Sequence, residues 1–164
     1  MSSKPHAAVD AKEFKRACGR FATGVTVATV CDSAGTPHGL TVSSFTSVSL
    51  EPPLILVCIG HEASVIQHFR SAAHFGISIL GEEQRTLSDH FARKGHDRFD
   101  GVDWHPGAAG VPVIDGIVAS LECSVHERFP AGDHDIFVGK VIHTYVHEDA
   151  RPLLYFASRY RHLG

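Results

Sequence analysis

The sequence predicts a mainly β protein, a small antiparallel barrel with a few short helices packed outside it. At least six segments have the apolar and β-branched pattern of strands, and clusters of Gly, Pro and Asp separate them. Only two or three short segments have a helical pattern, and no internal repeat or second domain is visible. The 164 residues and the hydrophobic content of 43% suit one domain with its own core. We therefore expect a disordered lead, residues 1–9, and a single domain, residues 10–164.

Charge, apolar segments and cysteines exclude several classes of protein. Lys and Arg number 15 against 18 Asp and Glu, so the formal charge of -3 indicates no basic surface for nucleic acid. No segment has the length of a signal peptide's apolar core or of a membrane span, which predicts a soluble cytoplasmic protein with no membrane partner. The four cysteines lie far apart and form no C-x-x-C pair, so we expect neither a disulfide framework nor a metal site.

The first element is predicted to be a helix of about three turns. Asp10 is followed three residues later by Glu13, as in a capping box. The next apolar residues are spaced as on one helix face: Phe14, Ala17, Cys18 and Phe21. The segment GRFATG, residues 19–24, has the outer glycines of a phosphate loop but lacks the Lys-Ser/Thr that should follow, which disfavours a nucleoside triphosphate site.

A strand, a turn and a long extended segment follow. Residues 24–31 are β-branched, residues 32–35 have turn composition, and the chain returns from Pro37 as a second strand. Residues 38–54, HGLTVSSFTSVSLEPPL, are small, hydroxylated and β-branched until two prolines stop the pattern. Such a segment leaves backbone N–H groups and hydroxyls uncovered, so a ligand-binding wall and a plain Ser/Thr-rich edge strand are about equally favoured.

The middle of the chain alternates between strands and helices. The apolar run Leu54–Ile59 predicts a strand buried on both faces. Residues 62–72 and 82–94 predict helices, and residues 74–80 predict a strand between them. The side chains expected to face inward from the helices are Val65, Ile66, Phe69, Leu87 and Phe91. Basic residues Arg93, Lys94 and Arg98 gather after the second helix, either as ordinary partners of the helix dipole or as a phosphate site.

The last third of the chain predicts a loop and three strands. Residues 100–111 are rich in Gly, Ala and Pro and predict a surface loop anchored by Trp104. Residues 117–129 and 134–147 have strand patterns on either side of a turn at residues 130–133, and residues 153–156 predict a last short strand.

Two other groups of residues predict neither a metal site nor a catalytic nucleophile. His143 and His147 lie near Glu148, but no third ligand follows at a fixed spacing, so a metal site is disfavoured. Ser43 and Ser44 lack the G-x-S-x-G surround of a hydrolase nucleophile.

Five segments in order resemble the short-chain flavin reductases, the reductase components of two-component flavin-dependent monooxygenases. They are FKRACGRFATGVTVAT, HGLTVSSFTSVSLEPPLILVCIG, HFARKGHDRF, ERFPAGDHDIFVGKV and PLLYFASRY, which span about Phe14 to Tyr160. One such segment is weak, whereas five in order are specific. The chain is most similar to reductases that serve monooxygenases of aromatic-compound or polyketide metabolism, and PAGDH is the sharpest shared run.

The resemblance implies an FMN-binding split barrel, antiparallel and of Greek-key type, that forms a homodimer and holds FMN or FAD at the dimer interface. It also implies NADH or NADPH as the hydride donor, an activity of the EC 1.5.1 type, and release of the reduced flavin to a separate monooxygenase. The implied flavin wall comprises Thr41, Val42, Ser43, Ser44, Cys58, Ile59 and Gly60. The implied phosphate contacts are Ser64, Phe91, Ala92, Arg93 and Lys94, and the residues facing the nicotinamide are His134, Ser158, Arg159 and Tyr160.

This assignment makes chemical sense because hydride passes from nicotinamide C4 to flavin N5 and the cofactors supply the difficult chemistry. The protein must hold two rings with the reacting atoms about 3–3.5 Å apart. N–H donors would stabilise the charge of the reduced flavin, and no catalytic nucleophile is expected. His134 is the one candidate catalytic side chain, as a donor to the nicotinamide carboxamide or a gate over the flavin; residues alone favour a turn cap there.

Two other functions remain open from the sequence. A non-catalytic flavin- or haem-binding split-barrel carrier or sensor would keep the flavin wall but would not need PAGDH or the terminal Arg-Tyr. A pyridoxamine-phosphate-oxidase-like enzyme would need a denser basic phosphate pocket than this sequence has.

Overall fold

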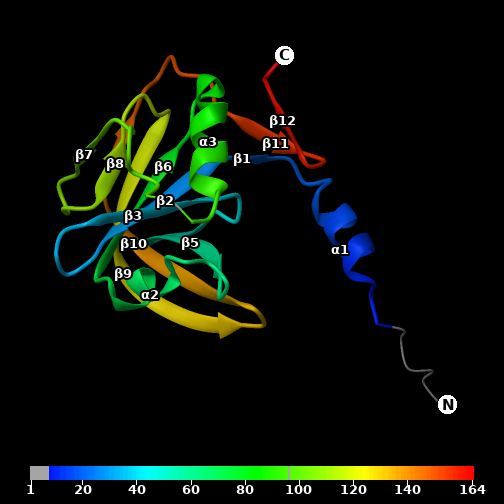
Figure 1. Ribbon diagram of the computed structural model, residues 1–164, viewed down its shortest axis with the longest axis horizontal. Coiled ribbons are helices and arrows are strands. Elements are labelled where there is room, and N and C mark those ends of the chain that lie inside the picture. The colour runs from blue at the N-terminus through cyan, green and yellow to red at the C-terminus, as the bar shows by residue number, and fades with distance from the viewer. Residues whose placement is uncertain (1–7, 96) are drawn as a thin grey trace.

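The computed structural model describes residues 8–95 and 97–164 and is organised around one seven-stranded antiparallel sheet (Figure 1). Its strands are β2 Thr26–Cys31, β3 Pro37–Val42, β4 Thr46–Leu50, β5 Pro53–Gly60, β6 His74–Ile79, β9 Ala119–Ala131 and β10 His134–Val146. They follow the order β3-β2-β6-β9-β10-β5-β4. Within the described residues the edge strands β3 and β4 do not pair with each other, so the sheet stays open, as the predicted split barrel requires.

Smaller elements surround this sheet. A three-stranded sheet consists of β1 Thr23–Gly24, β11 Leu154–Phe156 and β12 Arg159–Arg161, and a hairpin consists of β7 Trp104–Pro106 and β8 Pro112–Ile114. The helices are α1 Ala11–Cys18, α2 Ile66–Ser71 and α3 Arg85–Ala92, with a 3-10 turn η1 Glu82–Gln84 before α3. The segment predicted as a surface loop, residues 100–111, therefore contains one strand of a hairpin, since residues 104–106 pair with residues 112–114.

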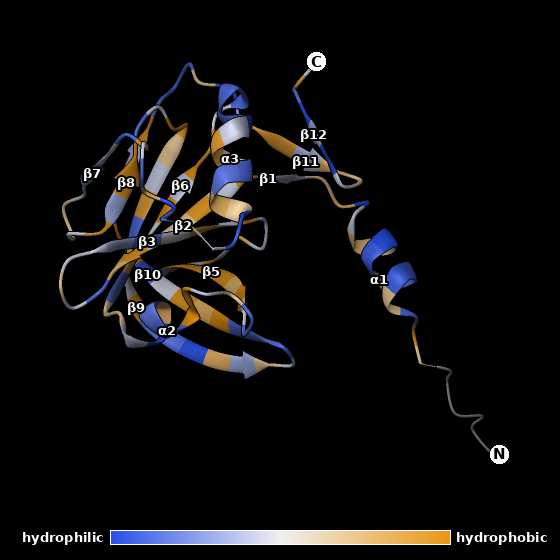
Figure 2. Ribbon diagram, viewed as in Figure 1, coloured by the Kyte–Doolittle hydropathy of each residue, from blue (hydrophilic) through white to orange (hydrophobic). Residues whose placement is uncertain are grey.

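Two hydrophobic clusters form the core. The first lies between the sheet and α2 and contains Val57, Phe69, Phe75 and Phe137, of which none is more than 1% exposed. The second lies under α3 and the β7–β8 hairpin and contains Val27, Leu80, Phe91, Ile114 and Leu153. Figure 2 shows apolar residues concentrated on the strands of the main sheet. Phe91 of this cluster also lies against Gly39 of β3, which places α3 beside β3 at the candidate site.

Helix α1 begins where predicted, because the Asp10 side chain accepts a hydrogen bond from the Glu13 N–H. The prediction of about three turns was too long, since the helix has 8 residues. None of its residues is buried, and Phe14 and Phe21 are 60% and 78% exposed. Figure 1 shows α1 projecting from the body, so its predicted apolar face is not covered by the described residues.

Two further predictions need correction. The run Leu54–Ile59 is not buried on both faces, because exposure alternates along β5 and only Ile55, Val57 and Ile59 are buried. β5 pairs with the edge strand β4, and within the described residues no second layer covers its other face fully. The helix predicted over residues 62–72 is limited to α2, although Val65, Ile66 and Phe69 face the core as expected.

No helix among the described residues is both long enough and apolar enough to cross a membrane. Residues 1–7 of the predicted disordered lead lie outside the described part of the chain.

Candidate active site

Three adjoining hollows follow β3 and bring together many of the predicted site residues. The first, which we call the Tyr160 pocket, has a volume of about 220 Å³ and is lined by Val25, Thr41, Ser43, Ser88, Ala92, Tyr155 and Tyr160. The second, the Lys94 pocket, has a volume of about 250 Å³ and is lined by Leu40, Thr41, Glu62, Ala63, Phe91, Ala92, Lys94 and Arg98. The two share Thr41 and Ala92, so they lie on either side of one β3–α3 seam.

The third hollow, the Ser64 pocket, continues the run toward the start of β3. Its volume is about 320 Å³, and Ser64, Gly39 and Arg98 line it together with His38 and His68. Because Arg98 also lines the Lys94 pocket, the three hollows adjoin one another in a series along β3. An elongated ligand with a ring at one end and a phosphate at the other suits this shape.

Tyr160 closes one end of the series through a hydrogen-bonded chain. Its phenol donates to Asp89 Oδ1 at 2.8 Å and lies 2.9 Å from the Ser88 hydroxyl. The Thr41 hydroxyl donates to the Ser88 carbonyl at 2.7 Å, so β3, α3 and β12 are tied together. Burial raises the pKa of Tyr160, and the Asp89 carboxylate adds to this effect. The phenol therefore stays protonated at neutral pH and acts as an anchor.

The predicted basic cluster divides into two roles. Arg98 is buried and donates to the carbonyls of Arg93 and Gly39 at 2.9 Å each, which fixes the loop after α3 against β3. Burial lowers the pKa of Arg98. Lys94 is exposed and lines its pocket, so its ammonium group can reach an anion. The cluster thus combines a structural cation with an accessible one, while the Arg93 side chain is exposed at the surface.

Only some side chains of the implied flavin wall face the hollows along β3. Thr41 and Ser43 line the Tyr160 pocket, whereas Val42 and Ile59 point into the first core cluster. Ser44 is committed to β5, because its hydroxyl accepts from the Cys58 N–H and donates to the Cys58 carbonyl, both at 2.9 Å. Burial raises the pKa of the Cys58 thiol, which argues against a nucleophilic role.

His134 lies over the end of β5. It pairs with Gly60 across β5 and β10, and a Cβ atom built on Gly60 would lie 3.5 Å from the His134 Nε2. The other nitrogen, Nδ1, lies 2.7 Å from Asp133 Oδ1, and this hydrogen bond lowers the pKa of Asp133. Asp133 therefore orients the His134 ring and leaves the Nε2 atom for a ligand. In the neutral ring Nε2 accepts a hydrogen bond, and in the protonated ring it donates one.

A charge cluster beside His134 was missed from the sequence. Asp135 is buried and accepts from Arg70 Nε at 2.7 Å, and its other oxygen lies 2.9 Å from His61 Nε2. Arg70 comes from α2 and His61 follows β5, so the three residues meet only through the β5–β10 register. The sequence signal was the second acidic residue of the run Asp133-His134-Asp135, which flanks the candidate catalytic histidine.

Asp135 makes stability depend on pH in the acid range. The Arg70 hydrogen bond, assisted by His61, lowers the pKa of the folded carboxyl below its value in the unfolded chain. The carboxylate therefore stabilises the fold above the ordinary Asp pKa of about 3.9, and this contribution is lost as the pH falls through the folded-state pKa. We expect the difference in unfolding free energy between the wild type and Asp135→Asn to shrink below about pH 4. Urea unfolding of both proteins from neutral to acid pH measures this, and a difference that stays constant contradicts it.

His134 and the segment Ser158–Tyr160 do not meet within one chain. His134 lines neither the Tyr160 pocket nor the Lys94 pocket, and Figure 1 shows the β9–β10 turn well apart from the β11–β12 hairpin. Ser158 adopts a left-handed conformation with φ of 60° in the turn before β12, and Arg159 is exposed. The resemblance implied that all of them face one nicotinamide.

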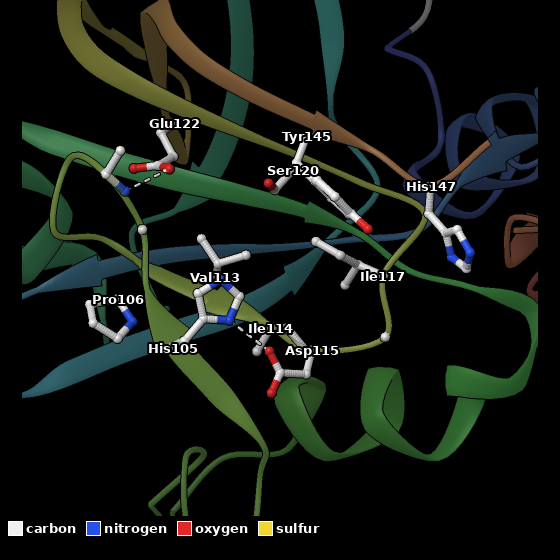
Figure 3. A pocket seen from close by; sticks show the side chains of 13 residues that line it. His105, Pro106, Val113, Ile114, Asp115, Ile117, Ser120, Glu122, Tyr145 and His147 are labelled. Carbon is white, nitrogen blue, oxygen red and sulfur yellow. Dashed lines mark hydrogen bonds and ion pairs between the residues drawn. The ribbon is translucent and has the colours of Figure 1, made fainter.

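A larger cavity lies elsewhere and contains no predicted site residue. It has a volume of about 510 Å³ and lies between the β7–β8 hairpin and the ends of β9 and β10 (Figure 3). His105 Nδ1 lies 2.7 Å from Asp115 Oδ1 at its mouth. The buried Glu122 carboxylate accepts from the N–H groups of Ala108 and Ala109, so it holds the hairpin loop. Size alone therefore does not identify the site.

Comparison with known proteins identifies the family of this chain. The sequence model of the flavin reductase like domain matches residues 18–164. The actinorhodin polyketide dimerase of Streptomyces coelicolor is 44% identical over 153 residues, which cover 93% of this chain and 86% of that protein. The reductase component of the flavin-dependent trigonelline monooxygenase of Acinetobacter baylyi is 46% identical over 130 residues, which cover 79% of this chain but 42% of that longer protein.

A solved structure shows the same architecture. The NADH:FAD oxidoreductase of Streptomyces globisporus, in complex with NAD and FAD fragments, superposes with a TM-score of 0.89 and 41% sequence identity, covering 96% of this chain and 97% of that one. The predictions of the flavin reductase family and of its split-barrel fold are thus confirmed. The chain belongs to the flavin reductase like family.

Proposed function

We propose that this protein is an NAD(P)H:flavin oxidoreductase that reduces FMN or FAD and supplies the reduced flavin to a separate monooxygenase. The observation that carries this proposal is the series of hollows along β3, which has small residues at the Tyr160 end and Ser64, Lys94 and Arg98 at the other. A flat ring needs the first kind of surface and a phosphate needs the second. The bound cofactors supply hydride transfer, and the protein supplies their alignment.

The relatives support both halves of the proposal. The Streptomyces globisporus protein is an NADH:FAD oxidoreductase, and the Acinetobacter baylyi protein is the reductase component of a monooxygenase. A cytoplasmic location, as the sequence predicts, agrees with four free cysteines. Initial rates with each pairing of NADH or NADPH with FMN or FAD test the activity and rank the cofactors. No oxidation of either nucleotide with either flavin contradicts the proposal.

His134 is proposed to contact the nicotinamide carboxamide through Nε2. We expect His134→Ala to raise the KM for NADH about fivefold, since one hydrogen bond is worth about 1 kcal/mol. The KM for flavin should change less than about twofold, because His134 lies outside the series of hollows along β3. The matched control is His143→Ala, an exposed histidine on the same strand. Equal changes in the two KM values would count against this role.

A homodimer is proposed on two observations. Phe14 of α1 and Phe21, which follows the helix, are exposed and are not covered by the described residues; exposed aromatic faces of this kind mark interfaces. His134 and Ser158–Tyr160 lie apart within one chain, so a second chain can bring them together. We expect light scattering to give twice the mass of one chain. The double variant Phe14→Ser, Phe21→Ser should give the monomer mass, whereas Lys12→Ser on the same helix should remain dimeric.

A further inference from the structure

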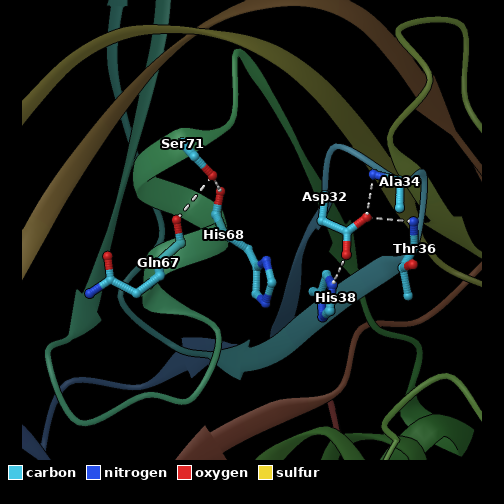
Figure 4. A network of polar contacts seen from close by, with 7 residues as sticks. All are labelled: Asp32, Ala34, Thr36, His38, Gln67, His68 and Ser71. Carbon is cyan, nitrogen blue, oxygen red and sulfur yellow. Dashed lines mark hydrogen bonds and ion pairs between the residues drawn. The ribbon is translucent and has the colours of Figure 1, made fainter.

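We propose that Asp32, His38 and His68 form a binding site for a divalent transition-metal ion such as Zn²⁺. Each residue offers one ligand atom, and these atoms all lie within 4.8 Å of one another (Figure 4). Asp32 and His38 come from the β2–β3 hairpin and His68 comes from α2, so the site joins two elements that border the Ser64 pocket. Their separation in the sequence is why no metal site was expected from spacing.

The carboxylate is oriented for a ligand by its own turn. Asp32 Oδ1 accepts from the N–H groups of Ala34 and Thr36 at 2.9 Å each, which leaves Oδ2 directed at His38. Oδ2 lies 3.0 Å from His38 Nε2. Zinc–nitrogen and zinc–oxygen bonds are about 2.0–2.2 Å long, so two ligand atoms on one ion are separated by about 3–3.5 Å. The Asp32–His38 pair already has this separation. The backbone hydrogen bonds to Asp32 Oδ1 hold the carboxylate in place, as the hydrogen-bond partners of metal-binding carboxylates do.

The second imidazole is held close to the first. The His38 and His68 rings stack face to face with centroids 3.6 Å apart and planes within 7°. Both rings are half-buried, so their positions are limited by packing. For both nitrogens to reach one ion, the rings must tilt open from the stack. This requires a rotation of the His38 and His68 side chains.

The donor set selects the class of ion. Two imidazole nitrogens and one carboxylate oxygen favour Zn²⁺, Ni²⁺, Co²⁺ or Cu²⁺ over Mg²⁺ or Ca²⁺, which prefer oxygen ligands. Arg98, which also lines the Ser64 pocket, has its guanidinium group directed to the carbonyls of Gly39 and Arg93. A bound ion would link the hairpin to α2 and thereby hold the wall of the Ser64 pocket.

The test is calorimetric titration of the untagged full-length protein with ZnCl₂, followed by thermal unfolding with and without zinc. We expect one ion per chain, and a rise in Tm of about 5 °C or more when zinc exceeds its Kd a hundredfold. His38→Ala and His68→Ala should each weaken binding at least tenfold. The matched control His105→Ala removes a surface histidine that also pairs with a carboxylate, Asp115, but is outside the cluster. It should bind zinc like the wild type.

Co²⁺ provides a second readout that does not depend on stability. Its visible absorption should report nitrogen and oxygen ligands and should be lost in His68→Ala. His68→Ala removes a ring at the edge of α2 and leaves the Asp32 turn intact, so a folded variant is expected. The proposal is overturned if zinc shows no saturable binding, if His68→Ala binds like the wild type, if His105→Ala weakens binding equally, or if the cobalt spectrum shows thiolate ligands.

Discussion

Ala92→Trp is expected to lower kcat/KM for flavin about a hundredfold or more while the protein stays folded. Ala92 is exposed at the end of α3 and lines both the Tyr160 pocket and the Lys94 pocket. An indole at this position fills the seam that the two hollows share, so a flavin ring could not lie against Thr41. Displacement of a reacting ring by about 1 Å is enough for a loss of this size. Steady-state rates at varied FMN and FAD measure the effect.

The matched control is Ala108→Trp, which places the same side chain at an exposed alanine in the larger cavity beside the β7–β8 hairpin. We expect it to retain flavin kinetics close to those of the wild type. Both substitutions are at exposed positions, and we expect both to change stability by less than about 0.5 kcal/mol. Full activity in Ala92→Trp, or an equal loss in Ala108→Trp, would show that flavin does not bind along β3.

Gly139→Val is expected to lower the unfolding free energy by at least about 3 kcal/mol. Gly139 is on β10, where the pairing with β9 shifts register, and the first core cluster lies directly against it. A Cβ atom there would lie 2.4 Å from Phe75 Cζ and 2.7 Å from Cys123 Cβ. Phe75 and Cys123 are fully buried, so neither can move aside without opening the core. Chemical denaturation of the variant and the wild type measures the loss.

The control for Gly139→Val is Lys140→Val, which adds the same β-branched residue at the next, exposed position of β10. Its unfolding free energy should stay within about 1 kcal/mol of the wild type. If Gly139→Val unfolds at the same denaturant concentration as the wild type, this contradicts the close packing of Phe75 against Gly139 of β10.

The sequence predicted local structure and the core well, because both follow from short-range patterns. The turn at Asp32, the N-cap at Asp10 and the inward side chains of α2 and α3 occur as expected. The apolar face of α1 was also recognised, but a pattern indicates only that a face is apolar and not which surface covers it. The alternating exposure of β5 was missed for a related reason, since an apolar run does not show that its neighbour is an edge strand.

The sequence named candidate site residues but did not show the long-range contacts around them. Thr41, Ser43, Ala92 and Tyr160 line one pocket between β3 and α3, and their assignment to flavin, phosphate and nicotinamide stays a prediction. The link from Asp135 to Arg70 and His61 depends on strand register and on α2, and the cluster of Asp32, His38 and His68 joins a hairpin to a helix. Such long-range contacts leave no regular spacing in the sequence. The commitment of Ser44 to Cys58 is also a tertiary contact that composition does not show.

The most direct measurement is anaerobic mixing of a small amount of the protein with a large excess of FMN and of NADH, followed through the flavin's visible absorbance. The proposed reductase treats flavin as a substrate, so it should bleach the whole flavin pool over many turnovers, while Ala92→Trp should bleach it far more slowly. Flavin that binds to the protein but is not reduced by NADH or NADPH, or bleaching limited to one equivalent per chain, would contradict the account and indicate a flavin carrier or sensor.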